Sequence, residues 1–318
     1  MRSARAATGF RDEVDAAELS FPLVPRWRPV GSAFGRLRAA RRGIGSSVAG
    51  TRPYRPGDDP GLIDWKLSAR LSSLRSEADF FVREDFADEA PRLVVVADRS
   101  PSMALYPDEL PWLSKPRAVA AVWRAVATTA VRELGLAGYL DTAGGDGWLA
   151  PRSAVRFDAV TDRLDDAPWD GGPDGLGQAL DRLQQSRRSL PAGTFVFVCS
   201  DFVCVPEPET WLRALGFRWD IVPVIVQDPV WEQSFPPAAG LVVPFAEPGG
   251  RLRLVRLTRA EARVRREANE ARLARLLADF RGLGLDPIVI GDAAPQAVLA
   301  QFADWAEARL ANRRGEWR

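Results

Sequence analysis

Two apolar runs of the chain are each followed by residues whose side chains carry oxygen atoms. These residues are Asp98, Ser100 and Ser102 after the first run, and Ser200 and Asp201 after the second. The runs, 93–96 and 195–199, are short and rich in β-branched or aromatic residues, as is typical of strands that are buried on both faces. Ligands of open α/β sheets bind where strands end. Carboxylates and hydroxyls are the donors that hard cations prefer. The two runs therefore predict a hard-cation site.

Composition narrows the chemistry of such a site. The chain of 318 residues contains no histidine, which removes the commonest general base and the usual transition-metal ligand. Its two cysteines, Cys199 and Cys204, are too few for a structural zinc cluster, and we interpret them as small buried side chains rather than a redox pair. The net charge of +1 gives no indication of a nucleic-acid surface. Any metal must be held by oxygen.

The elements that position these side chains alternate along the chain after residue 92. Hydrophobic periodicity predicts strands at 94–98, 136–142, 148–150, 195–201, 221–226 and 288–290. It predicts helices at 116–134, 155–164, 176–189, 209–215 and 259–283, and a closing helix that contains Val298 and Phe302. The charges of the helix at 259–283 are interpreted as a solvated face.

This alternation predicts an α/β fold, a doubly wound and mostly parallel sheet of the Rossmann-like kind. In the strand order 3-2-1-4-5-6 the first and fourth strands are neighbours at the point where the winding reverses. The first strand ends at Asp98 and the fourth at Asp201. We therefore expect these two carboxylates to face one crevice.

The domain organisation is predicted in three parts. Residues 1–20 are mixed and charged, and we expect a loose segment. Residues 21–90 form a small β-containing module, in which Trp65 to Leu71 is either alternating strand or a short helix. Residues 91–318 form the main domain, with a β-hairpin inserted at about 229–257. No apolar stretch is long enough for a signal peptide or a membrane span, so a cytoplasmic protein is expected.

The motif Asp98-x-Ser100-x-Ser102 with Ser200-Asp201 resembles the metal-ion-dependent adhesion site of the von Willebrand factor type A fold. Further motifs resemble the bacterial domain-of-unknown-function family fifty-eight, which joins a short β segment to a type A domain. They are Arg52-x-Tyr54-x-Pro56-Gly57-Asp58-Asp59, Ile63-Asp64-Trp65, Ser68-Ala69-Arg70 and Asp228-Pro229. The block from Arg52 to Trp65 is interpreted as structural rather than as a binding site.

The resemblance implies Mg²⁺ or Mn²⁺ as the ion. Ser100 and Ser102 would bind it directly, and Asp98 and Asp201 would hold ion-bound waters. Type A domains add a threonine from a Gly-Gly-Thr loop, but the loop here reads Gly171-Gly172-Pro173-Asp174. Either Asp174 takes the threonine's place, or the site is degenerate and binds no metal. The aspartates and serines could instead cap turns and helix starts.

Three functions follow as hypotheses. The resemblance implies a non-enzymatic interaction module, whose metal accepts a partner's carboxylate and whose partner is a MoxR-type AAA+ ATPase in complex assembly or cofactor maturation. The second hypothesis is a Mg²⁺-dependent hydrolase or phosphoryl-transfer enzyme that uses Asp98 and Asp201. Without histidine, a serine nucleophile in it would need a carboxylate or a lysine as base, and Lys66 and Lys115 lie near the relevant motifs. The chain lacks the Gly-x-Ser-x-Gly and Walker lysine motifs of such enzymes. The third is a metal-free scaffold that binds protein by shape.

Overall fold

The computed structural model describes a defined part of the chain, and all structural statements below concern that part. Its residues are 20–26, 42–54, 63–72, 80–86, 90–105, 113–143, 147–153, 155, 157–237, 240, 242–246 and 252–315. The predicted loose segment 1–20 lies almost entirely outside it, as do Asp58 and Asp59 of the Arg52 block.

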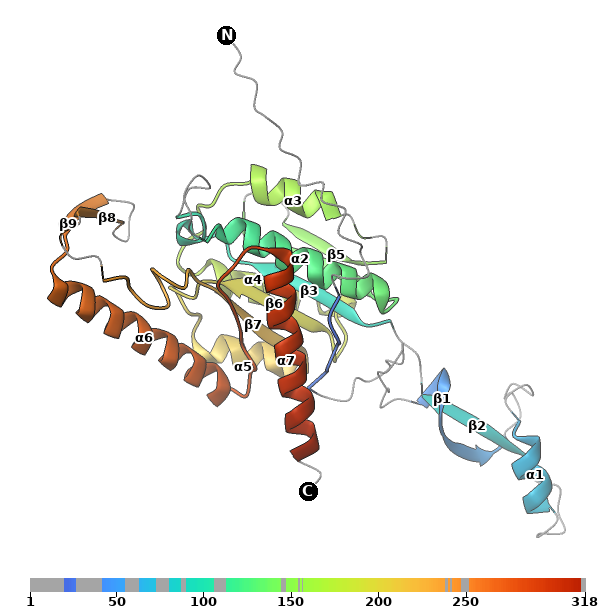
Figure 1. Cartoon of the computed structure of the whole chain (residues 1–318). Coiled ribbons are helices and arrows are strands. Elements are labelled where there is room, and N and C mark those ends of the chain that lie inside the picture. Colours follow the sequence, from blue (N-terminus) through green and yellow to red (C-terminus); the bar gives the residue numbers. More distant parts are fainter. Residues whose placement is uncertain are drawn as a thin grey trace.

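A six-stranded sheet forms the centre of the molecule (Figure 1). Its strands are β3 (Arg92–Ala97), β4 (Leu136–Asp141), β5 (Trp148–Arg152), β6 (Phe195–Ser200), β7 (Asp220–Val226) and β10 (Ile288–Ile290). Their order is β10-β7-β6-β3-β4-β5, which is the predicted 3-2-1-4-5-6. All pairs are parallel except that β5 joins β4 antiparallel at the edge. The fold is therefore mixed α/β with a mostly parallel sheet.

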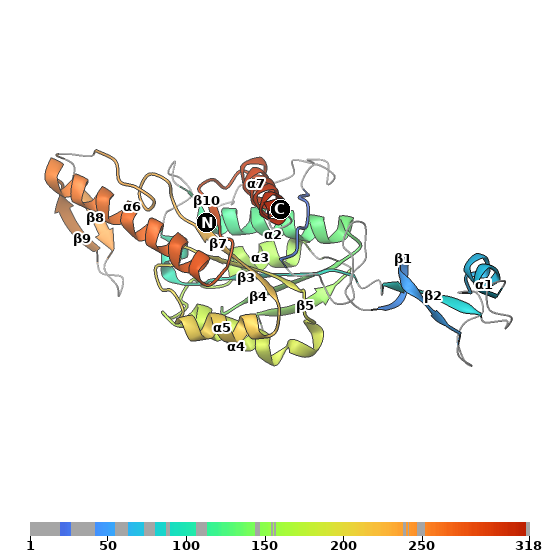
Figure 2. The same ribbon diagram turned by 90° about the horizontal axis from the view of Figure 1, so that it is seen from below.

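Helices cover both faces of this sheet (Figure 2). On one face lie α2 (Lys115–Arg132), α3 (Phe157–Asp166) and α7 (Pro295–Gly315). On the other lie α4 (Gly175–Gln185), α5 (Pro208–Gly216) and the end of α6 (Arg259–Gly282). Alternate residues of each central strand enter the two cores, which explains why β3 and β6 are apolar throughout. Each helix named here coincides closely with a predicted one.

The small module is built from β1 (Arg42–Pro53), α1 (Trp65–Ser72) and β2 (Phe81–Phe86), and it lies to one side of the sheet (Figures 1 and 2). β1 and β2 pair antiparallel. The Asp64 carboxylate accepts the Leu67 backbone N–H at 3.0 Å and so caps the first turn of α1. The chain after Trp65 is therefore helix rather than alternating strand.

Residues 21–26, which the sequence assigned to that module, pack instead against the main sheet. Phe21 is 4% exposed, and its ring centroid lies 4.5 Å from that of Phe302 on α7 and 6.0 Å from that of Phe197 on β6. The Arg26 backbone N–H donates to the Asp220 carboxylate at 2.7 Å. This short segment thus completes the core between the sheet and α7.

The predicted hairpin is present as β8 (Val242–Ala246) and β9 (Leu252–Arg256), which pair antiparallel. It leads into α6 through a capping box, in which Thr258 and Glu261 bond each other's backbone N–H groups. Together they form a projection at the side opposite the small module (Figure 1).

Candidate functional site

The turn after β3 and the end of β6 meet at the carboxyl edge of the sheet. The Asp98 backbone N–H donates to the Cys199 carbonyl at 2.9 Å, which continues the β3–β6 ladder by one residue. The Ser200 hydroxyl donates to Asp98 Oδ2 at 2.6 Å. The two motifs identified in the sequence therefore lie together, because neighbouring parallel strands end at the same edge.

The Asp98 carboxylate organises the turn that follows it. Its Oδ1 accepts the Ser100 backbone N–H at 2.8 Å, and its Oδ2 accepts the Ser100 hydroxyl at 3.1 Å. The Ser100 and Ser102 hydroxyl oxygens lie 3.0 Å apart. Both serines are partly exposed, whereas Asp98 is buried. The arrangement presents two hydroxyls at the surface above a buried carboxylate.

Burial raises the pKa of Asp98 above its usual value, because a desolvated carboxylate is disfavoured. The hydrogen bonds from Ser200 and Ser100 lower this pKa in part, whereas the nearby charge of Asp201 raises it. A cation placed at the serine hydroxyls would offset the cost of ionising Asp98.

Asp201 has a cationic partner that the sequence did not reveal. The Lys115 ammonium, at the first residue of α2, donates to Asp201 Oδ2 at 2.8 Å and to Glu232 Oε1 at 2.5 Å. It also donates to the Ser102 carbonyl at 3.1 Å. Lys115 and Asp201 are each 1% exposed. The crevice thus holds a buried ammonium between two carboxylates, beside the Asp98–Ser102 turn.

Glu232 reaches this position through the loop 228–235, which α6 holds. The Glu232 carboxylate accepts the Asp228 backbone N–H at 2.7 Å, and Asp228 in turn accepts the backbone N–H groups of Val230 and Trp231. From α6, Asn269 donates to the Trp231 and Ser234 carbonyls. Burial raises the pKa of Glu232, and the charge of Lys115 lowers it in part.

Part of the polar face of α6, which the sequence predicted to be solvated, therefore forms hydrogen bonds to the loop 228–235. Besides Asn269, Arg266 donates to the Phe235 carbonyl and Arg272 to the Glu232 carbonyl. Arg263, by contrast, is a solvated residue of that face, with its side chain 74% exposed.

The glycine-rich loop lies beside the turn, but the Asp174 side chain is exposed. The Gly171 backbone N–H donates to the Arg99 carbonyl at 2.9 Å, and a Cβ at Gly171 would lie 2.9 Å from that same oxygen. Asp174 occupies the position before α4, makes no capping hydrogen bond there and has Oδ1 next to Gly177. The backbone of this loop approaches Ser100 at Gly171.

A second buried ionic cluster lies under the turn. The Arg99 guanidinium is fully buried, with Nε 3.3 Å from an Asp141 oxygen, and it stacks on the Trp169 ring at 4.3 Å. Arg163 binds the same Asp141 carboxylate through Nε and through its terminal nitrogen at 2.6 Å. Because Arg99 is adjacent to Asp98, this cluster fixes the backbone from which the turn begins.

Among the described side chains of the site, the oxygen donors that have no cationic partner are gathered on the Asp98–Ser102 turn. Ser100, Ser102 and Asp98 supply neutral and anionic oxygens on one turn, as Mg²⁺ requires. Lys115, by contrast, already binds Asp201 Oδ2. Among the described residues, no group of three or more histidine, cysteine, aspartate or glutamate side chains is placed to hold a metal ion.

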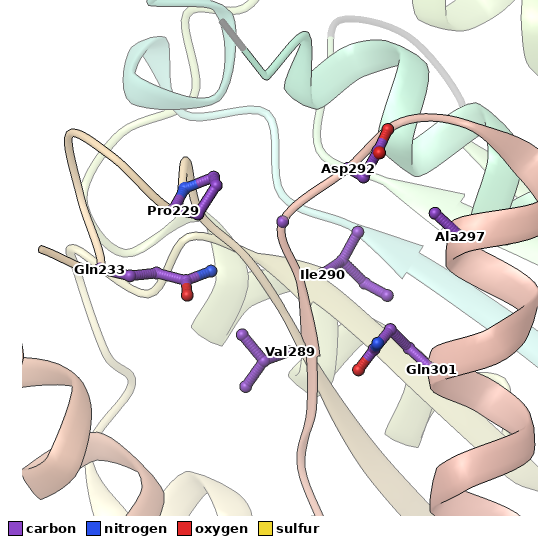
Figure 3. A pocket seen from close by; sticks show the side chains of 8 residues that line it. Pro229, Gln233, Val289, Ile290, Asp292, Ala297 and Gln301 are labelled. Atoms are coloured by element: carbon purple, nitrogen blue, oxygen red, sulfur yellow. The ribbon is translucent and has the colours of Figure 1, made fainter.

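A pocket of about 360 Å³ lies beside β10 (Figure 3). Its lining includes Pro229, Gln233, Val289, Ile290, Asp292 and Gln301. The Gln233 amide donates to the Gln227 carbonyl at 3.0 Å, and the Gln227 amide donates to the Asp201 carbonyl at 2.6 Å. The pocket wall is thus connected by hydrogen bonds to the end of β6.

Fold and site together define a mixed α/β protein with a cluster of polar and charged side chains at the carboxyl edge of a mostly parallel sheet. The family described as "Protein of unknown function DUF58" matches residues 50–275. The chain belongs to this family. None of the helices in the described part is long and apolar enough to cross a membrane.

Solved structures resemble the chain at low identity. Conserved hypothetical protein BatB from Bacteroides thetaiotaomicron has a TM-score of 0.40 and 16% identity, covering 68% of this chain and 99% of that one. An aerotolerance-related membrane protein from Bacteroides fragilis NCTC 9343 has a TM-score of 0.40 and 13% identity, covering 69% and 99%. An uncharacterized membrane spanning protein from Vibrio fischeri has a TM-score of 0.20 and 16% identity. No curated protein matches the chain.

Proposed function

We propose that this protein is a von Willebrand factor type A-like interaction module, and that the turn Asp98–Ser100–Ser102 binds Mg²⁺ or Mn²⁺. The observation that carries the proposal is the pair of serine hydroxyls, 3.0 Å apart, above the buried Asp98 carboxylate. Such oxygen donors suit a cation that keeps several of its waters. Bound there, the ion would supply an open position for a partner's carboxylate.

The surroundings of the turn support a protein as the partner. Loops at the same sheet edge carry exposed aliphatic side chains: Leu105 after β3, Val203 and Val205 after β6, and Val230 after β7. Exposed apolar side chains close to a polar centre are typical of interaction surfaces. We propose a partner loop that presents one aspartate or glutamate among apolar residues.

The Lys115 contacts favour binding over catalysis. A lysine that acts as base for a serine must be neutral and bonded to the hydroxyl. Here the three donors of the ammonium have three acceptors, Asp201, Glu232 and the Ser102 carbonyl. Lys115, one of the bases that the enzyme hypothesis offers, is thus engaged by other acceptors, and we propose a non-enzymatic function.

Thermal unfolding with added cation tests the proposal. A ligand at about 100 times its Kd stabilises the folded state by about 2.7 kcal/mol, so Mg²⁺ and Mn²⁺ should raise Tm by several degrees. Asp98→Asn and the pair Ser100→Ala with Ser102→Ala should abolish the rise. Asp181→Asn, a change in an exposed acid on α4, is the matched control and should keep it.

Absence of any cation-dependent shift in the unmodified protein would contradict metal binding. It would support the second candidate, a metal-free scaffold, which the Lys115 ammonium beside Asp201 favours. The partner is proposed, from the resemblance alone, to be a MoxR-type AAA+ ATPase. Its binding should be lost in EDTA and in Asp98→Asn if the ion bridges the two proteins, and kept in both if shape alone is recognised.

A further inference from the structure

The Lys115 side chain is buried beside the Asp98–Ser102 turn and is held there by ion pairs. Its side chain is 1% exposed, its Nζ lies 2.8 Å from Asp201 Oδ2 and 2.5 Å from Glu232 Oε1, and the Glu232 side chain is 11% exposed. An ammonium removed from water in this way is stable only when carboxylates compensate it. The three groups therefore act as one unit with a net charge of −1.

The Lys115 ammonium occupies the position from which a divalent ion would bind Asp201, so the ion would have to compete with the ammonium for this carboxylate. Asp201 Oδ1 accepts the Val203 backbone N–H at 3.1 Å, so both of its carboxylate oxygens are engaged. Among the described residues, the Asp98 carboxylate likewise has both oxygens engaged, but its donors are the neutral groups of Ser100 and Ser200 rather than an ammonium. The two aspartates that the sequence presents as equivalent thus have different electrostatic roles.

We propose that Lys115 is the resident cation of the Asp201 half of the crevice, and that it confines a divalent ion to the Asp98–Ser100–Ser102 half. This inference rests on the proposed cation site, and it names Lys115 as a residue that sets the affinity of that site for a divalent ion. Lys115 withholds the Asp201 carboxylate from the ion and, as a neighbouring positive charge, weakens the ion's binding. Glu232, which lies on the loop 228–235 bound by α6, holds the Lys115 ammonium in place by its ion pair.

A charge-balanced double variant tests the role of Lys115. Lys115→Met with Glu232→Gln removes one positive and one negative charge, so the net charge of the unit stays at −1 while Asp201 is released. Mn²⁺ binding, measured by titration calorimetry and by the spin resonance of free Mn²⁺, should become at least about tenfold tighter than in the unmodified protein. Adding Asp201→Asn to this double variant should cancel the gain.

A second variant keeps the test decisive if the double variant does not fold, as judged by circular dichroism. Asp201→Asn alone should retain Mn²⁺ binding, whereas Asp98→Asn loses it. Equal loss of Mn²⁺ binding in Asp201→Asn and Asp98→Asn would overturn the inference about Lys115. Equal Mn²⁺ affinity of the unmodified protein and the double variant would overturn it too, and in both cases the proposed cation site would stand.

Mn²⁺ binding by the double variant but not by the unmodified protein would uphold the role of Lys115 and refute a cation site in the natural chain. Binding by neither would overturn both.

Discussion

The two cysteines show how strongly burial sets the chemistry of a single residue. Cys199 is fully buried in β6, and burial raises the pKa of its thiol far above the ordinary value. Cys204, five residues later, is exposed in the loop that follows Asp201. Only a thiolate at the surface reacts readily, so the two side chains should behave differently although they are close in sequence.

The native protein should therefore react with one equivalent of a thiol reagent at mildly alkaline pH, and the unfolded protein with two. Cys204→Ser should remove the fast reaction, whereas Cys199→Ser should leave it. Two fast equivalents in the native state would contradict the burial of β6. A label at Cys204 would also report on the crevice, because the residue lies next to Val203, whose N–H binds Asp201.

Among the individual residues of the candidate site, the sequence predicted only those that lie at or just after the ends of strands. Asp98, Ser200 and Asp201 were found because each directly follows an apolar run, and the register of β3 with β6 brings them together. The pairing of Lys115 with Asp201 and Glu232 spans 86 and 117 residues of sequence. No local pattern encodes a contact at that distance, so the lysine was noticed only as a base and Glu232 was missed.

At the scale of elements, α6 is the support of the loop that carries Glu232. Asn269 donates to the Trp231 carbonyl at 3.1 Å and to the Ser234 carbonyl at 2.6 Å. Both bonds fix the loop backbone between β7 and the hairpin. A helix that reads as solvated from its charge pattern therefore positions a residue of the site.

Asn269→Ala should lower the free energy of unfolding by about 1–2 kcal/mol, because two buried or half-buried carbonyls lose their donor. Amide hydrogen exchange in residues 228–235 should rise more than elsewhere. Arg263→Ala on the exposed side of α6 is the control and should change neither quantity. Unchanged exchange in the loop of the Asn269 variant would show that α6 does not hold it.

Element prediction succeeded where burial dictates the pattern and failed where pairing is remote. The six strands of the main sheet, their order and the helices between them were expected, and the structure has them. β1 was not among the predicted strands, since its sequence Arg-Gly-Ile-Gly-Ser-Ser-Val-Ala-Gly-Thr-Arg-Pro is rich in glycine and serine and has little alternation. Its partner β2 lies far along the chain, and only that pairing makes it a strand.

At the scale of the whole molecule, residues 20–26 and α7 lock the first described residues to the last. The Arg309 guanidinium donates to both Asp220 oxygens at 2.9 Å and to the Val24 carbonyl at 2.9 Å. Asp220 also accepts the Arg26 N–H. Beside this buried ion pair, Phe21 packs on Phe197 and Phe302.

Phe21→Ala should therefore destabilise the main domain by about 3 kcal/mol, the cost typical of emptying a buried aromatic site. Phe80→Ala is the matched control, because Phe80 is 44% exposed and packs on Trp65 in the small module. Chemical denaturation followed by tryptophan fluorescence distinguishes them. Similar small losses in both variants would mean that residues 20–26 are dispensable for the main domain.

The path of the chain through this core has a consequence for the small module. The chain packs into the main body at Phe21, leaves it to form β1, α1 and β2, and returns to the body at β3. The module is therefore an insertion secured at two points, not an appendage hanging from a terminus. A protein that bound the module would therefore be connected to the main domain through two segments of the chain. One of these points is β3, which Asp98 directly follows, so a force on the module would be transmitted along one continuous strand to the Asp98–Ser102 turn.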